Sequence, residues 1–137
     1  MDRRLERILP NVQKPARYTG GELNEIIKDK RGVKLRMAFC FPDVYEIGMS
    51  NLGMRILYGV INNEPDIWCE RVFAPWGDMA EAMREQGIPL YALESGDPVS
   101  EFDVLGFSIG YEMAYCTVLD MLDMAGLPLR SADRPNL

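Results

Sequence analysis

Polar residues and glycines crowd the stretch FPDVYEIGMSNLGMRIL, which directly follows an apolar run. Asp43 and Glu46 are two carboxylates three residues apart, a pairing that suits general acid–base chemistry. The same acids would also stabilise the N-terminus of a following helix through its dipole. Tyr45, Gly48 and Ser50 complete the candidate site residues of this stretch. The spacing leaves both interpretations of the two acids open.

A second polar junction, FSIGYEM, follows another apolar run and contains Ser108. Open parallel sheets bind ligands at the carboxyl ends of their strands, where the topology changes direction. In a flavodoxin-like strand order the strands before the two junctions are neighbours, so Ser108 and Asp43 would line one crevice. Gly48 and Gly53 form a G-x-x-x-x-G pattern, but no Lys-Ser/Thr pair follows, which argues against a phosphate-binding P-loop.

The chain of 137 residues contains no histidine, which excludes His-based triads, histidine general bases and His–metal ligation within it. Its three cysteines, Cys40, Cys69 and Cys116, lie far apart and form no C-x-x-C pair. We therefore expect no catalytic and no metal-ligating residue in the chain itself. The cysteines are expected to pack as small apolar side chains in a reducing compartment.

The order of the secondary structure follows from runs and periods of apolar residues. Short β-rich runs predict strands at residues 33–41, 67–74, 88–95 and 102–110. Helical periods predict helices at residues 5–10, 22–28, 51–62, 77–87 and 113–126. Strands separated by helices indicate βαβ units, so the fold class is α/β, a doubly wound three-layer sandwich with a mainly parallel, flavodoxin-like sheet. Residues 1–32 are predicted to be a basic N-terminal extension, and residues 33–137 an α/β domain that is incomplete on its C-terminal side.

Three finer expectations concern the helices. Asp78 and Glu81 fit a D-x-x-E capping box, and Gly87 fits a helix end. Met49, Met54 and Met113, which lie near the predicted crevice, are expected to fill the core. The apolar stripes expected to face inward are Leu52, Ile56, Leu57, Val60 and Ile61 in one helix, and Tyr115, Val118, Leu119, Leu122 and Ala125 in another.

Charge is distributed unevenly along the chain. Residues 1–36 hold ten Lys/Arg and five Asp/Glu, whereas residues 37–137 hold five and sixteen, for a net charge of −6. A basic arm suits nucleic acid, but no platform of aromatic and basic residues accompanies this one. We expect it to lie on an acidic surface, such as that of its own domain. No apolar run approaches the ~20 residues of a membrane helix, and the N-terminus lacks a signal-peptide core, so we expect a cytoplasmic protein without nucleic-acid or membrane partners.

The first junction resembles the cobalamin-binding loop of methionine-synthase-type domains, D-x-H-x-x-G followed by a helix. Asp43 matches the Asp and Gly48 the Gly, while Tyr45 stands where those domains have His. VLGFSIG resembles their second signature, an apolar strand ending in Ser, here Ser108. The resemblance implies that Asp43 and Ser50 offer hydrogen bonds to a corrinoid, that Gly48 lets the backbone approach it, and that Ser108 touches its nucleotide tail. A Gly-Gly third signature has no counterpart here.

A longer resemblance covers nearly the whole chain. VQKPARYTGGE, FPDVYEIGMSNLG, ALESGDP, FDVLGFSIGYEM and LDMAGLPLRSADR together are similar to the N-terminal region of a family of cobalamin-binding-domain radical S-adenosylmethionine (radical SAM) proteins. The resemblance implies a following barrel domain with a C-x-x-x-C-x-x-C motif. That domain would hold a four-iron four-sulfur cluster and S-adenosylmethionine. The three cysteines of this chain do not form the motif.

The replacement of the expected His by Tyr45 leaves two interpretations open. A neutral phenol, with a pKa of ~10, is a poor ligand for cobalt at neutral pH. The lower face of a corrin without a protein imidazole would then be left to water, to nothing, or to the Tyr45 ring as a steric floor. Alternatively, the domain keeps the fold and has lost the cofactor.

Three functions remain compatible with the sequence. The first is a non-catalytic N-terminal domain of a radical SAM enzyme, which holds a corrinoid or walls the active site of the following iron–sulfur barrel domain. The second is a docking module without a small ligand. The third is a flavodoxin-like flavin or nucleotide binder. The expected partner is the downstream domain, and an exposed sheet edge would also permit self-association.

Overall fold

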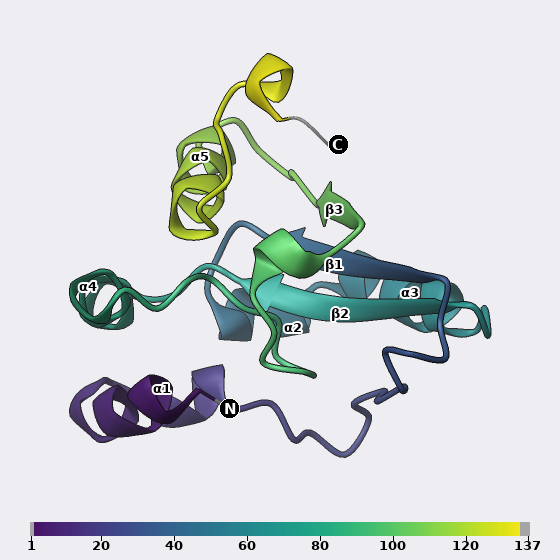
Figure 1. The fold of residues 1–137 in the computed structure, drawn as a ribbon, viewed down its shortest axis with the longest axis horizontal. Coiled ribbons are helices and arrows are strands. Elements are labelled where there is room, and N and C mark those ends of the chain that lie inside the picture. Colours follow the sequence, from purple (N-terminus) through teal and green to yellow (C-terminus); the bar gives the residue numbers. More distant parts are fainter. Residues whose placement is uncertain (1, 135–137) are drawn as a thin grey trace.

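A computed structural model describes residues 2–134, in which helices flank one parallel sheet (Figure 1). Within these residues the sheet has three strands in the order β2-β1-β3, and both pairings are parallel. The strands are β1 (Leu35–Phe41), β2 (Ile67–Phe73) and β3 (Val104–Phe107), and the helices are α1 (Arg3–Ile8), α2 (Tyr45–Ser50), α3 (Leu52–Asn62), α4 (Gly77–Gln86) and α5 (Ala114–Met124). The predicted α/β class and parallel sheet are confirmed.

The central strand β1 divides its side chains between two cores on opposite faces of the sheet, because successive residues of a strand point to opposite sides. Ala38 and Cys40 belong to the larger core, which also contains residues of α1, α4 and α5. Phe39 belongs to the smaller core, which α3 covers. Strands buried on both faces read as continuous apolar runs, which is why the sequence predicted β1 and β2 well.

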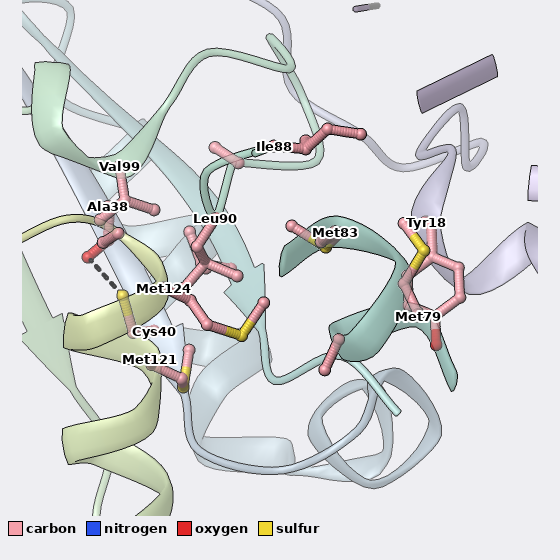
Figure 2. Packing of buried hydrophobic residues seen from close by; sticks show 14 of the residues in the cluster. Tyr18, Ala38, Cys40, Met79, Met83, Ile88, Leu90, Val99, Met121 and Met124 are labelled. Atoms are coloured by element: carbon pink, nitrogen blue, oxygen red, sulfur yellow. Dashed lines mark hydrogen bonds between the residues drawn. The ribbon is translucent and has the colours of Figure 1, made fainter. Parts of the chain in front are cut away.

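Methionine supplies much of the larger core (Figure 2). Met79 and Met83 from α4 and Met121 and Met124 from α5 are each at most 7% exposed. The unbranched thioether side chain adapts to irregular gaps between helices that are not parallel to one another. Cys40 lies in the same core, and burial raises the pKa of its thiol. It therefore packs as a small neutral side chain, as expected.

The N-terminal arm packs onto the domain instead of extending from it. Leu5, Ile8 and Tyr18 are buried in the larger core. Outside the core, the guanidinium of Arg17 pairs with the carboxylate of Glu46 at 2.9 Å. The basic arm thus lies on the acidic surface of its own domain, as expected from the charge distribution.

Residues 20–28, hereafter the strap, do not form the helix predicted for residues 22–28. Gly20 and Gly21 open the strap with φ angles of 62° and 82°. Glycine adopts this left-handed conformation without the steric cost that a Cβ would bring. From there the strap runs as irregular chain toward β1 (Figure 1).

Distant side chains replace the hydrogen bonds that a helix would have made in the strap. The N–H of Ile26 donates to the Tyr58 hydroxyl at 2.8 Å, and the carbonyl of Ile26 accepts from the Trp68 indole at 2.9 Å. The ammonium of Lys28 reaches the C-terminal end of α3, where a cation opposes the helix dipole. Its three acceptors, at 2.5–2.8 Å, are the carbonyls of Asn62, Glu64 and Ile67.

The segment predicted as a strand at residues 88–95 is a loop in the structure. It forms an isolated bridge between Tyr91 and Pro98, and a turn with Gly96 at φ 73° folds it back. The N–H of Leu93 donates to the carbonyl of Arg71 in β2 at 2.9 Å. The loop therefore covers the outer edge of β2 without becoming a fourth strand.

Helix α4 lies where it was predicted, but it is capped differently. Gly87 ends it in the left-handed conformation with φ 62°, as expected. The capping box of Asp78 and Glu81 is wrong: the N-cap residue is Trp76, and no side chain caps it. The Asp78 carboxylate instead accepts a hydrogen bond from the N–H of Gln13 at 2.7 Å. The acid thus ties the N-terminal arm to the helix.

Four of the five residues of the apolar stripe predicted to face inward on α3 face outward, whereas Ile61 is half-buried and packs against the smaller core. The buried residues of this helix are Met54, Tyr58 and Asn62. The exposed ones, at 49–67% exposure, are Leu52, Ile56, Leu57 and Val60. Helix α3 is therefore apolar on both sides, and the sheet covers one of them.

The stripe predicted for α5 is half correct. Leu122 and Ala125 are buried, but Tyr115 and Leu119 are 58% and 48% exposed. Cys116 and Met113 are exposed as well and do not pack in a core, so both expectations were wrong. Although apolar side chains are exposed on two helices, no helix within residues 2–134 has the length and apolar content needed to cross a membrane.

Replacing Gly48 by Ala is expected to destabilise the domain by about 1–3 kcal/mol, because the added methyl group would overlap the Phe73 ring. Gly59→Ala is the matched control, since a methyl group there meets nothing within 4 Å. Removing a glycine from the interior of α3 should stabilise the protein by roughly 0.5–1 kcal/mol. Urea unfolding measures both changes, and equal stability of the two variants would contradict the packing at Gly48.

Candidate functional site

The two polar junctions lie side by side, as the flavodoxin-like strand order predicts. β3 pairs with β1, and beyond the end of β3 the N–H of Ser108 donates to the carbonyl of Cys40 at 3.1 Å. This bond brings Ser108 to the carboxyl end of β1, one residue before that strand ends. The turn that contains Asp43 begins at the same edge of the sheet.

Asp43 shapes the turn between β1 and α2. Its Oδ1 accepts a hydrogen bond from the N–H of Val44 at 2.7 Å. Its carbonyl accepts from the N–H of Ala74 at 3.0 Å, which ties the turn to the end of β2. The half-buried carboxylate of Asp43 therefore has a local structural partner.

Tyr45 contacts the strap. Its hydroxyl donates to Oε1 of Glu22 at 2.6 Å, and its ring packs edge-on against Phe73 with 5.4 Å between the centroids. Burial and then the hydrogen bond to the Glu22 carboxylate raise the pKa of Tyr45 to about 12. The phenol therefore stays protonated at neutral pH and serves as a donor.

A buried ionic network continues from Glu22 into the sheet. Its other oxygen, Oε2, accepts from Arg71 at 2.9 Å, and Arg71 donates to Oε1 of Glu94 at 2.6 Å. Burial would raise the pKa of Glu22, but its hydrogen bonds from Tyr45 and Arg71 outweigh burial and lower it. Burial dominates at Glu94 and raises its pKa, although Arg71 opposes the change. Tyr45, Glu22, Arg71 and Glu94 thus form one connected chain of side chains.

Glu46 does not form an acid–base pair with Asp43. Its carboxylate pairs with Arg17 at 2.9 Å and Lys14 at 3.3 Å, and the Arg17 hydrogen bond chiefly lowers its pKa to about 2. Ser50 is exposed, and its hydroxyl donates to the backbone carbonyl of Glu46 at 2.6 Å. Glu46 therefore binds the N-terminal arm, and Ser50 bonds within α2. Within residues 2–134, neither residue forms a hydrogen bond with Ser108.

The glycine of the first junction approaches the core of its own domain. Gly48 is buried, and a side chain there would collide with Phe73 and contact Phe41. On its other side Gly48 borders a cavity of about 630 Å³ between the strap and α3. Among the five predicted site residues, Gly48 alone lines this cavity, whose other walls include Glu22, Leu23, Met49, Ile56 and Arg71.

The ionic network around Arg71 has a signal in the sequence that none of the predictions above uses. The strand IWCERVF carries Glu70 and Arg71 in the middle of an apolar run, where charged residues must be paired. Arg71 faces the strap, and Glu70 on the opposite face binds Arg36 at 2.5 Å. Arg36 also pairs with Asp97 at 2.9 Å. Two adjacent charges in a buried strand thus indicated one ionic network on each face.

The residues present do not fit a protein-ligated metal centre. Within residues 2–134 no group of three or more Cys, Asp or Glu side chains could hold a metal ion. Tyr45 does not fit the lower axial position of a corrinoid, because its protonated hydroxyl is bonded to Glu22. Ser108 and Asp43, in contrast, stand at the edge where the resemblance predicts them.

A comparison with protein families matches residues 53–137 to radical SAM proteins, N-terminal. The chain belongs to this family. A radical SAM N-terminal domain implies a radical SAM domain further along the parent protein, so the expected partner is supported at that level. No curated protein and no solved structure matches the chain. Cobalamin binding by this radical SAM N-terminal domain stays a prediction.

A double-mutant cycle tests the bond between Tyr45 and the strap. Tyr45→Phe should destabilise the domain by ~1 kcal/mol, and its effect should largely vanish in a Glu22→Ala background, because the Tyr45 hydroxyl has then already lost its acceptor. Urea unfolding of the four proteins gives the coupling energy. Tyr45→Phe combined with Asp97→Asn is the control, and its effects should add. Additivity in the Glu22 cycle would show that the bond contributes nothing.

Proposed function

We propose that this radical SAM N-terminal domain is non-catalytic and walls the active site of the radical SAM domain in its parent protein. The observation that carries the proposal is an exposed apolar surface that begins where β3 ends, hereafter the edge surface. Its members, which are 43–81% exposed, are Ile109, Tyr111, Met113, Tyr115 and Leu119. Exposed apolar clusters of this kind are typical of interaction sites.

The position of the edge surface supports the proposal. It lies at the carboxyl end of a parallel strand, the side on which open α/β sheets meet their ligands. Family membership supplies a partner domain that would cover this side. Docking there would exclude water from the space between the two domains, which radical chemistry requires to avoid side reactions.

The ionisable groups of the first junction support a structural role. Glu46 is paired with Arg17, Glu22 with Arg71, and the Tyr45 phenol is protonated. Arg17 and Lys14 both contact Oε1 of Glu46 and lower its pKa, so this carboxylate is a weak proton acceptor, although its Oε2 has no hydrogen-bond partner within residues 2–134. General acid–base catalysis by Asp43 and Glu46 is therefore not part of the proposal.

A second candidate function is corrinoid binding at the same edge. The bond between Ser108 and the end of β1 favours it, because the two signature loops of cobalamin domains are adjacent here. Asp43 and Ser50 would offer hydrogen bonds, and Ser108 would contact the nucleotide tail. A corrinoid would supply methyl-transfer chemistry when bound. Tyr45 would contribute only the bulk of its ring, since its hydroxyl is held by Glu22.

The sheet edge beside the edge surface adds a second contact. The outer edge of β3 pairs with no other strand within residues 2–134, and Val104 at its start is 40% exposed. Unpaired strand edges attract further strands. In our proposal this edge also faces the polypeptide of the parent protein, and self-association is the expected behaviour of the chain on its own.

Methionine oxidation tests the docking of the edge surface. Met113 is 81% exposed, whereas Met37 is half-buried in β1. In the whole parent protein, Met113 should be oxidised more slowly than Met37 during a hydroxyl-radical pulse, because the radical SAM domain would cover it. Mass spectrometry of the two peptides measures both rates. Faster oxidation of Met113 than of Met37 in the whole protein would refute the proposal that the radical SAM domain covers the edge surface.

Hydroxocobalamin separates the two candidate functions. The whole parent protein, mixed with hydroxocobalamin and passed over a gel-filtration column, should elute without the visible absorbance of a corrin if the domain is only a wall. Retention of one corrin per protein would establish the second candidate instead. Tyr45→His tests the geometry of the turn, because an imidazole there would restore the missing ligand and should produce retention if the crevice is intact.

A further inference from the structure

The strap and α3 border an apolar groove that faces away from the larger core. We propose that this groove receives an amphipathic helix from the radical SAM domain of the same polypeptide. The inference concerns a different surface from the edge surface and shares with the proposed function only the partner domain. Its basis is the shape, the composition and the anchoring of the groove.

The groove is apolar on both walls. The strap contributes Leu23, which is 99% exposed, and α3 contributes Leu52 and Ile56, which are 67% and 54% exposed. Between the walls lies the cavity of about 630 Å³, with Met54 and Tyr58 among the residues that line it. Complete exposure of a leucine next to an open apolar cavity indicates a site that another apolar group fills.

Ionic and hydrogen bonds hold the groove open. At one end of the strap, Glu22 is fixed by Tyr45 and Arg71, and at the other end Lys28 is fixed to the end of α3. In between, Ile26 bonds to two side chains of the domain. The strap therefore cannot collapse onto Ile56 without breaking these bonds. A preformed groove reduces the entropy that a partner loses on binding.

The extent of the apolar surface favours a helix over a small molecule. Beyond the cavity, Leu57 and Val60 continue the exposed face along α3 at 49% and 61% exposure. Helices that bind in grooves use anchors at positions i, i+3, i+4 and i+7, which match an apolar surface of this length. Arg55 is the one charged residue in the sequence of α3, and it borders the cavity. An acidic residue beside the anchors of the helix would complement it.

The shape of the groove disfavours a second copy of the chain as its occupant. A two-fold dimer brings the same surface of both copies together, so that surface must be self-complementary. Two concave grooves would face each other across a void. The radical SAM domain that family membership places in the same polypeptide is tethered, and tethering raises its effective concentration at the groove.

Thiol labelling in the whole parent protein tests the groove. Ile56→Cys places a thiol on its α3 wall, and Glu85→Cys places one on an exposed position of α4 as the helical control. We expect iodoacetamide to modify Cys at position 56 at least tenfold more slowly than at position 85, as measured by mass spectrometry of the two peptides. Equal rates would overturn the proposal.

Two further variants identify the occupant. Adding Arg55→Glu should speed the labelling at position 56 severalfold, since the acidic partner would be repelled, whereas Arg55→Lys should leave it slow. An added negative charge lowers the reactivity of a neighbouring thiol, so a faster rate can only reflect lost cover. Slow labelling that disappears on dilution would identify a second copy and overturn the proposal. The oxidation of Met113 is measured in a separate experiment. A negative labelling result at the groove therefore does not affect the test of the edge surface.

Discussion

The burial of Arg71 in the middle of β2 constrains everything built around that strand. A guanidinium leaves water only when carboxylates replace its hydration, and removing one partner of such a buried pair costs about 3–5 kcal/mol. Glu94 supplies one carboxylate from the loop along the outer edge of β2, and Glu22 supplies the other from the strap. One buried charge therefore fixes two irregular segments that have few bonds of their own. The sheet is covered on that side because its charge must be neutralised.

The same constraint determines the chemistry available at position 45. Glu22 has two oxygens, and Arg71 and Tyr45 each take one of them. A side chain that ligates a metal from this turn would have to be free of such a bond. The structure thus gives a physical reason for a tyrosine at this position: its hydroxyl bonds to Glu22 and holds the strap in place. Position 45 has a structural role that explains its residue type without a cofactor, and that role is the one on which the preformed groove depends.

Strands and their order could be predicted from the sequence because the decisive information was local. β1 and β2 are mostly apolar, with Arg36 in β1 and Glu70 and Arg71 in β2, and the flavodoxin-like strand order placed β3 next to β1. The helix predicted for residues 22–28 was wrong because the hydrogen bonds of the strap are made with Tyr58 and Trp68, more than thirty residues away. The predicted capping box was wrong because the Asp78 carboxylate accepts a hydrogen bond from the N–H of Gln13 in the N-terminal arm. Of the five predicted site residues, Asp43 and Ser108 share the expected edge, whereas Tyr45 bonds to Glu22 and Gly48 packs against Phe73, both more than twenty residues away. Local patterns do not contain these distant partners.

The outward stripes of α3 and α5 show what periodicity measures. An apolar period identifies a face that will be covered, but it does not say by what, and a helix that is apolar all round is normally buried on every side. In α3 the sheet covers Met54 and Tyr58, while the stripe that the sequence assigned to the core remains exposed beside the strap. In α5 Leu122 is buried, whereas Tyr115 and Leu119 belong to the edge surface. The prediction was wrong about the direction of Leu52, Ile56, Leu57 and Val60 in α3 and of Tyr115 and Leu119 in α5. In our proposal these surfaces contact the radical SAM domain that the family match implies in the parent protein.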